Sequence, residues 1–278
     1  MTSPYGRTPA SSAQTPVSSG PAPAPSGAAP ASSGPRVLVV RNSDRSGPGR
    51  LLPWWEEMGL TVVEVPGAST PASPAGYDAV VLLGGGFLPD ADDHAPWLPA
   101  ERELARRAVA DGVPLLGICL GAQVLALATG GTVCGAYGRA ERGSCAVSLR
   151  PEAAEDALFV GLPGEFRVIQ NHRDQITALP PGAALLAGSA ACPVQGFRVG
   201  RRAWGVQFHP EAGADRLAGW DEAALADAGL DLRALRAEAE RAEPESARSA
   251  RRLAVNFAEV VRRNAGAAPD LVPAVGGS

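Results

Sequence analysis

Short apolar runs alternate along this chain with longer segments in which apolar residues recur at helical spacing. The runs that predict strands lie at 36–40, 60–65, 77–86 and 113–118. The helical segments lie at 50–59 and 98–112, and a further one begins at Leu120. Strands that alternate with helices are typical of a parallel sheet covered on both faces. We therefore predict an α/β fold, a three-layer sandwich around a mostly parallel central sheet.

The second half of the chain begins with strand-like runs and ends with helical ones. Four further strands are predicted around 166–170, 183–186, 194–199 and 203–208. The last two flank the sequence GRR, which is typical of a hairpin turn. Residues 215–264 are rich in Ala, Arg, Glu and Leu and predict a helical C-terminal portion, in which we expect Pro244 in the first turn of a helix.

Composition divides the chain into three parts. Of the first 34 residues, 26 are Pro, Ala, Ser or Gly, and only Arg7 is charged. Such a segment buries too little apolar surface to offset its ordering entropy, so 1–34 are predicted to be a disordered leader. One domain is predicted at 35–265, followed by a flexible tail at 266–278.

Charge and cysteine content narrow the functional class. The formal net charge is -4, and 45% of residues are hydrophobic, which is typical of a globular protein and does not indicate nucleic acid as a partner. No apolar run approaches the ~20 residues of a membrane span, and no secretory signal is evident. The four cysteines lack metal-ligand spacing. We expect a cytoplasmic protein with no membrane partner, no metal and no cofactor.

The sequence GICLGAQ places Cys119 between two glycines, where a predicted strand passes directly into a helix. A sharp turn of this kind exposes the residue at its tip, as in the nucleophile elbow of α/β-hydrolases. The N-terminus of a helix lowers the pKa of a thiol and leaves the backbone N–H of Leu120 available to an oxyanion. Taken alone, the motif equally fits a small buried thiol in a tight turn.

A thiol nucleophile needs a base, and the base needs a group that orients it. The chain has three histidines, and His209 follows an apolar strand, with Glu211 two residues later. This spacing predicts that Glu211 fixes the ring of His209 beside the edge of the sheet. The alternative is that His209 caps a strand and Glu211 makes an ordinary surface contact.

The pair GICLGAQ and WGVQFHPE resembles the signature of class I glutamine amidotransferases. From Pro35 to Asn264 the chain is similar to free-standing relatives of the GMP synthase glutaminase domain. The resemblance implies the flavodoxin-like fold of this family and hydrolysis of the glutamine side-chain amide to glutamate and ammonia. It implies a thioester on Cys119, with His209 as general base and Glu211 as its orienting residue.

The same resemblance implies roles for four further residues. Gly85, in the sequence LLGGGF, and Leu120 match the backbone donors of an oxyanion hole. Gln123 matches a position that contacts glutamine, and His172 is a candidate substrate contact, with a structural histidine as the alternative.

Two positions depart from the family's pattern. Arg173 stands where relatives carry glycine after the histidine, so we expect a different local backbone there. Gly86 stands where proline is common, which predicts a more mobile loop.

The other polar and sulfur-containing residues predict ordinary structural roles. His94 lies in an acidic loop, PDADDHAPW, for which surface polarity is favoured over a metal site. Cys134, Cys145 and Cys192 are expected to be packing residues.

Three functions stay open at this point. The first is a glutaminase that supplies ammonia to a synthetase on another chain, with the helices of 215–264 as a docking surface. The second is a γ-glutamyl hydrolase that acts on γ-glutamyl amines or peptides. The third is a non-catalytic domain that binds glutamine or a partner. The presence of both Cys119 and His209 favours an enzyme.

Overall fold

Strand β1 (Arg36–Arg41) shows how alternation builds the centre of the fold. In the computed structural model, which describes residues 34–266, Val37 and Val39 lie in the core on one face of the sheet. Leu38 and Val40 lie in the core on the other face, and all four are fully buried. A continuous apolar strand is stable here because helices cover both faces.

The central sheet has nine strands in the described part of the chain, in the order β2-β1-β3-β4-β11-β10-β9-β6-β7. The mutually parallel strands are β1, β2 (Thr61–Pro66), β3 (Ala79–Leu82), β4 (Leu115–Ile118) and β11 (Ala203–Val206). Antiparallel pairing extends this half through β10 (Gly196–Val199), β9 (Ala184–Gly188), β6 (Glu141–Leu149) and β7 (Glu165–His172). A separate two-stranded sheet pairs β5 (Thr132–Cys134) with β8 (Gln175–Ala178).

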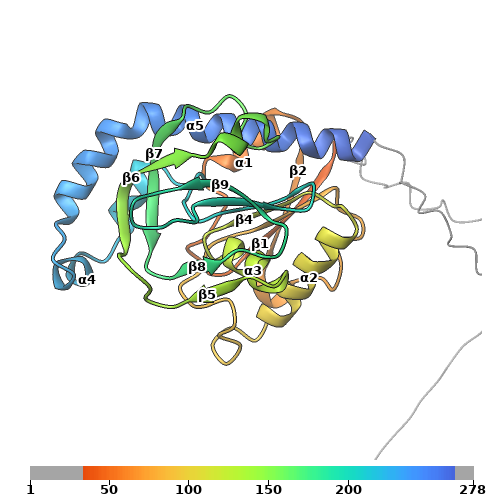
Figure 1. The fold of residues 1–278 in the computed structure, drawn as a ribbon, viewed down its shortest axis with the longest axis horizontal. Helices are drawn as coiled ribbons and strands as arrows, with labels where there is room; N and C mark the ends of the chain where they lie inside the picture. The colour runs from red at the N-terminus through yellow and green to blue at the C-terminus, as the bar shows by residue number, and fades with distance from the viewer. Residues whose placement is uncertain (1–33, 267–278) are drawn as a thin grey trace, which may run out of the picture. The chain divides into compact units, whose positions relative to one another are not determined.

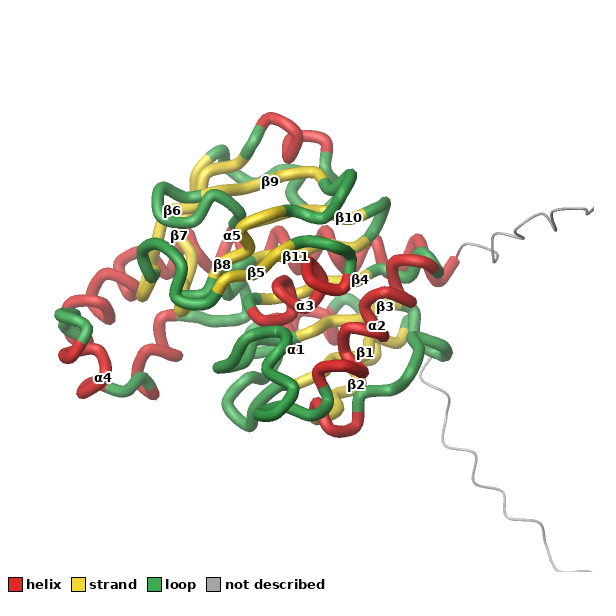
Figure 2. Tube along the Cα trace, turned by 60° about the horizontal axis from the view of Figure 1, so that its bottom comes forward, coloured by secondary structure: helices red, strands yellow, loops and turns green. Residues whose placement is uncertain are grey.

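Helices form the two outer layers (Figures 1 and 2). On one face pack α1 (Leu51–Glu57) and α5 (Leu232–Gly266); on the other pack α2 (Leu98–Ala110) and α3 (Leu120–Ala128). Short helices complete the fold: α4 (Glu222–Asp227) and the 3₁₀ turns η1 (Gly67–Ser69), η2 (Pro151–Glu155) and η3 (Ala214–Gly219). The arrangement confirms the predicted three-layer α/β fold.

Most predicted elements in the described residues are present. The hairpin of β10 and β11 around the sequence GRR is confirmed. Strands β5, β6 and β8 were not predicted. In β6 the burial does not alternate strictly, so its sequence lacks the period of two that marks a strand. The predicted leader and tail lie outside the described residues, except for Gly34 and Gly266.

The expectation for Pro244 is wrong, because this residue lies inside α5 rather than in a first turn. Proline has no N–H to donate to the preceding turn, so it normally kinks or ends a helix. The Ala, Arg and Glu residues on both sides favour helix strongly enough to continue through it. Figure 1 shows that α5 curves along its length.

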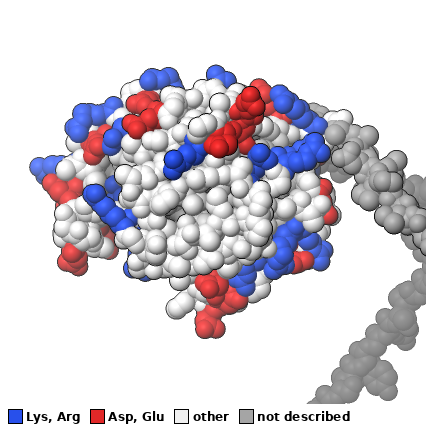
Figure 3. Space-filling view, viewed as in Figure 1, with Lys and Arg blue, Asp and Glu red and all other residues white. Residues whose placement is uncertain are grey.

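The C-terminal half of α5 is held to the sheet by its apolar face. Leu253, Phe257 and Val261 are buried, as the sequence predicts, and the ring of Phe257 packs 5.7 Å from that of Trp55 in α1. Along the edge formed by α5, acidic and basic side chains are interspersed (Figure 3). Among the helices of residues 34–266, none is long and apolar enough to span a membrane.

Asp156 is a buried polar anchor between η2 and the sheet. Its Oδ1 accepts hydrogen bonds from the backbone N–H of Leu158 at 2.9 Å and from the indole N–H of Trp204 at 2.9 Å. Its Oδ2 accepts from Nε–H of Arg198 at 2.8 Å. Loss of this carboxylate would leave the fully buried indole N–H of Trp204 without its partner.

We expect Asp156→Ala to lower the free energy of unfolding by about 3 kcal/mol, because buried donors lose their acceptor. Urea unfolding followed by tryptophan fluorescence measures this change. Glu155→Ala is the matched control, because the neighbouring Glu155 is exposed. Equal unfolding midpoints for the two variants would contradict the anchoring role.

Candidate active site

Cys119 lies at the tip of a sharp turn between β4 and α3. Its φ of 53° and ψ of -107° place it in a backbone region that L-residues rarely adopt. A Cβ on Gly117 would lie 2.4 Å from the carbonyl oxygen of Gly121, and one on Gly121 would lie 2.0 Å from that of Leu82. Only glycine fits at both positions, so the G-x-C-x-G pattern is required by the elbow.

His209 and Glu211 lie beside the elbow, just beyond the end of β11. The backbone N–H of His209 donates to the carbonyl of Ile169 in β7 at 2.9 Å. Its ring Nδ1 lies 2.7 Å from Oε1 of Glu211. A Cβ on Gly84 would lie 3.3 Å from Cε1 of His209 and 3.6 Å from Cβ of Cys119. The predicted cysteine, histidine and glutamate are therefore brought together.

The charges of this group favour a protonated His209. Burial alone lowers the pKa of the imidazole, but the neighbouring charges of Glu211 and Cys119 raise it well above its ordinary value. Its Nε2 is buried and has no hydrogen-bond partner within residues 34–266. The ring thus has one nitrogen fixed by the carboxylate and one available for proton exchange.

Arg50, which directly precedes α1, holds the turn that carries His209 and Glu211. Its Nε–H donates to the carbonyl of Pro210 at 2.8 Å, and its backbone N–H donates to that of Glu211 at 3.1 Å. The guanidinium also bonds Glu243 at 2.8 Å and Ser246 at 3.1 Å, both in α5. Arg50 therefore connects the turn to two helices, α1 and α5.

Asn42 supports the glycine loop that follows β3. Its Nδ2–H group donates to the carbonyl of Leu83 at 3.1 Å and to Oε2 of Glu101 at 3.2 Å, and its Oδ1 accepts from the indole of Trp97 at 2.8 Å. A Cβ on Gly85 would lie 3.1 Å from Cβ of Asn42. This network fixes the backbone of the loop without a side chain from Gly85.

Buried glutamine side chains surround Cys119. Gln207 donates from Nε2 to Sγ of Cys119 at 3.6 Å, and its Oε1 accepts from Nε2 of Gln123 at 3.2 Å. Gln123 also donates to the carbonyl of Asp174 at 3.3 Å. Gln123 was predicted, whereas Gln207 was not assigned a role, although it lies within the motif WGVQFHPE.

The elbow opens into a cleft of about 1170 Å³. Gly85, Gln123 and His172 line it together with Cys119 and His209. From the elbow the cleft extends past Arg142 and Asn171 to α4. The cleft therefore extends well beyond Cys119. Residues of the antiparallel half of the sheet form one of its walls.

The two departures from the family pattern, Arg173 and Gly86, both lie at the cleft. Arg173 lies at the cleft with an exposed side chain, and it is not among the described non-glycine residues with positive φ, which are Cys119 and Ala136. Gly86 is exposed, and a Cβ there would meet no atom within 4 Å.

The acidic loop does not join the site. His94 is exposed, and Asp92 forms two hydrogen bonds with Arg102 at 2.8 Å each. Cys134 and Cys145 are partly buried and free, and neither lines the cleft.

Fold and site together define a three-layer α/β protein in which an elbow cysteine lies beside a histidine–glutamate pair. A family model described as glutamine amidotransferase class-I matches residues 56–217, and the chain belongs to this family. The protein is thus a member of an enzyme family that the motifs around Cys119 and His209 had indicated.

Individual relatives agree with this membership. The chain is 43% identical over 100 residues to a glutamine-hydrolyzing GMP synthase subunit of Thermococcus kodakarensis, covering 36% of this chain and 51% of that protein. It is 36% identical over 156 residues to the protein of the same name from Thermoplasma acidophilum, covering 56% and 74%. The chain thus spans about half the length of the first of these relatives.

A solved structure gives the same result for the fold. The crystal structure of a glutamine amidotransferase from Thermotoga maritima superposes with a TM-score of 0.72 at 30% identity, covering 81% of this chain and 98% of that one. A glutamine amidotransferase from Methylobacillus flagellatus also has a TM-score of 0.72, at 23% identity, which supports the fold alone.

The carboxyl group of Glu101, beneath the glycine loop, makes the free energy of unfolding depend on pH. Burial raises the pKa of its carboxyl from 4.5 to about 7, against the opposing hydrogen bond from Asn42. The proton is therefore held more tightly in the folded state than in the unfolded one. Glu101 consequently weakens the fold as pH rises from 4.5 through about 7.

We expect Glu101→Gln to stabilise the protein above neutral pH by up to about 3 kcal/mol and to have little effect near the unfolded pKa. Urea unfolding at acidic and mildly alkaline pH measures the difference. Glu103→Gln, on the same helix but at a half-exposed residue, should produce no such gain. A stability gain that is independent of pH would show that Glu101 does not titrate as described.

Proposed function

We propose that this protein hydrolyses the side-chain amide of glutamine, with Cys119 as nucleophile, His209 as general base and acid, and Glu211 as the residue that orients it. One observation carries the proposal. An elbow cysteine with positive φ lies next to a partly buried histidine whose Nδ1 is 2.7 Å from a carboxylate oxygen of Glu211. Membership of the class-I glutamine amidotransferase family supports the choice of substrate.

The raised pKa of His209 favours transfer of the thiol proton of Cys119 to its Nε2, and in the first step the resulting thiolate sulfur attacks the amide carbon. The carbonyl π electrons move to oxygen, which becomes an oxyanion. We assign the backbone N–H groups of Leu120 and Gly85 as its donors. Leu120 begins α3, where N–H groups have no partner within the helix, and each such donor contributes about 3 kcal/mol.

Collapse of this intermediate breaks the bond between carbon and nitrogen. His209 returns its proton to the leaving nitrogen, so ammonia departs and a γ-glutamyl thioester remains on Cys119. Water then attacks the thioester, with His209 again taking the proton. A second collapse expels the thiolate, which regains the proton, and releases glutamate. Glu211 stabilises the imidazolium at each stage without itself becoming protonated.

Gln123 and His172 are proposed to shape the substrate end of the cleft. Both line it, and both are held by hydrogen bonds with Asp174. Gln123 is 3% exposed and already bonded, so its contribution is to fix the wall and its polarity.

We further propose that the ammonia is used by a synthetase on another chain. The support is that the relatives from Thermococcus kodakarensis and Thermoplasma acidophilum are named as subunits of a glutamine-hydrolyzing GMP synthase. The exposed surface of α4 and α5 is the proposed contact, and co-purification of the full chain with its partner tests it.

The volume of the cleft favours a second candidate, a hydrolase of γ-glutamyl amines or peptides. At about 1170 Å³ the cleft exceeds the ~300–1,000 Å³ common for small-molecule sites. The same thioester chemistry would serve, with an amine instead of ammonia as leaving group.

We expect Cys119→Ala to reduce ammonia release from glutamine by at least about 10⁴-fold, because the thioester cannot form. A chloroketone analogue of glutamine should add one label per wild-type chain, located on Cys119 by mass spectrometry. Cys134→Ala is the control, since Cys134 does not line the cleft. An unchanged rate in Cys119→Ala, or labelling elsewhere, would refute the assignment.

Steady-state kinetics separate the two candidate substrates. We expect kcat/KM for glutamine to exceed that for γ-glutamyl butylamide by at least about tenfold, because methylene groups that find no apolar pocket lose binding energy. Preference for the butylamide would select the second candidate. Turnover of neither compound would reject both and leave a non-catalytic binding domain.

A further inference from the structure

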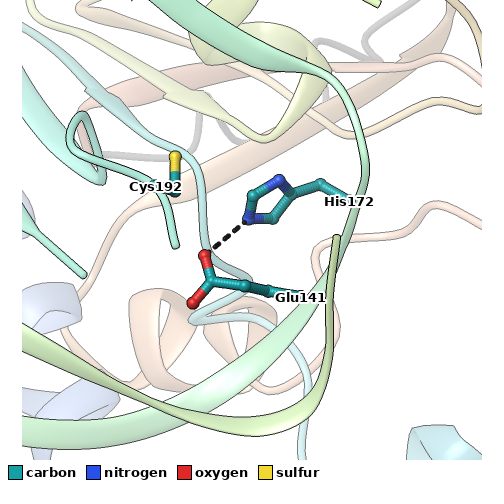
Figure 4. A group of neighbouring side chains, drawn as sticks. All are labelled: Glu141, His172 and Cys192. Atoms are coloured by element: carbon teal, nitrogen blue, oxygen red, sulfur yellow. Dashed lines mark ion pairs between the residues drawn. The ribbon is translucent and has the colours of Figure 1, made fainter. Parts of the chain in front are cut away.

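A second group of chemically reactive side chains lies behind the wall of the cleft. Glu141 begins β6, His172 ends β7, and the two are directly paired across the antiparallel ladder. Cys192 joins them from the connection between β9 and β10. The ligand atoms of all three lie within 4.8 Å of one another, and the residues are buried. Figure 4 shows the carboxylate facing the imidazole, with the sulfur beside the ring.

One ring nitrogen of this cluster, Nε2 of His172, is buried and forms no hydrogen bond with the described residues. Nε2 of His172 lies 3.2 Å from Oε2 of Glu141, but it forms no hydrogen bond with any group that the structure describes. His172 is only 5% exposed. Within residues 34–266 this buried nitrogen has only the ion-pair contact with Glu141, so a ligand placed between the two residues would give it a well-directed partner.

The remaining contacts hold both the ring and the carboxylate. Nδ1 of His172 lies 3.3 Å from the carbonyl oxygen of Asp174. Oε2 of Glu141 accepts from Nε2 of Gln195 at 2.6 Å and from Oγ of Ser189 at 3.1 Å. Within residues 34–266 the thiol of Cys192 donates one hydrogen bond, to the carbonyl of Val194 at 3.4 Å. Neutral donors around a ligating carboxylate are the usual outer contacts of a metal centre, where they orient the ligand.

We propose that Glu141, His172 and Cys192 bind one Zn²⁺ ion, through a carboxylate oxygen, Nε2 and the thiolate sulfur. Zinc accepts this combination of oxygen, nitrogen and sulfur ligands, and a water molecule completes four coordination. The two anionic ligands neutralise the double charge of the ion, which lowers the cost of burying it. On binding, the Cys192 thiol loses its proton to solvent, and the sulfur lone pair forms the bond to the metal.

The ion would join β6, β7 and the connection between β9 and β10 at one point. His172 and its neighbours Asn171 and Arg173 line the cleft, so the same point braces its wall. The role is structural and does not depend on which γ-glutamyl compound is hydrolysed. The proposal therefore stands or falls independently of the proposed function.

The test uses the full chain, stripped with a chelator and then titrated with Co²⁺ as a spectroscopic probe or with Zn²⁺. We expect about one ion per chain and a thiolate-to-Co²⁺ charge-transfer band in the near ultraviolet. Cys192→Ser preserves side-chain size and should abolish the band. Cys119→Ala and Cys145→Ala should retain it, because neither residue belongs to the cluster.

Glu141→Gln and thermal unfolding supply a second readout. Gln keeps the shape and hydrogen-bonding capacity of Glu141 but removes the charge, so Zn²⁺ should bind at least about tenfold more weakly to this variant. Zn²⁺ should raise the Tm of the wild type and not that of Cys192→Ser. A band that persists in Cys192→Ser, or one that disappears in Cys119→Ala, would overturn the proposal. So would a stripped wild type that binds no ion.

Discussion

The close approach of the elbow to strand β3 is the constraint on which the rest of the site depends. Gly121 passes so near the carbonyl of Leu82 that any side chain would collide with it, and Gly117 is restricted in the same way by Gly121. This contact seats α3 tightly against the sheet and drives Cys119 to a positive φ. Parallel strands end at the same edge, so the loop after β3 and the turn after β11 arrive at the same place.

The turn after β11 needs support that the elbow does not supply. Its Glu211 and His209 bring charge into a buried region, where each ion requires a partner. Arg50 supplies a positive charge behind this turn. Burial lowers the pKa of its guanidinium, and the negative charges of Glu243 and Glu211 oppose that shift. Because Arg50 also bonds α5, the long C-terminal helix contributes to the geometry of a site that it does not line.

Local sequence predicts the parts of this site that depend on local geometry. Strand β1 and helix α2 follow from periodicity, and the elbow follows from two glycines and one cysteine. The cluster of Glu141, His172 and Cys192 could not be predicted in this way, because its members lie on separate elements. The register of β6 with β7 pairs Glu141 with His172, and the connection between β9 and β10 brings Cys192 to them. The prediction for Pro244 is wrong for the opposite reason, because the helix propensity of its neighbours outweighs the preference of proline for the first turn of a helix.

The two halves of the sheet therefore have different roles in the site. The parallel half carries the elbow and the His209 turn, whose geometry allows little variation because backbone contacts restrict it. The antiparallel half supplies the wall with His172 and Arg173, which side-chain contacts hold in place. Side-chain networks tolerate substitution better than Gly121 does, where an added Cβ would lie 2.0 Å from the carbonyl oxygen of Leu82. For the proposed chemistry, substitutions that change substrate preference would thus fall on the wall and leave Cys119 unchanged.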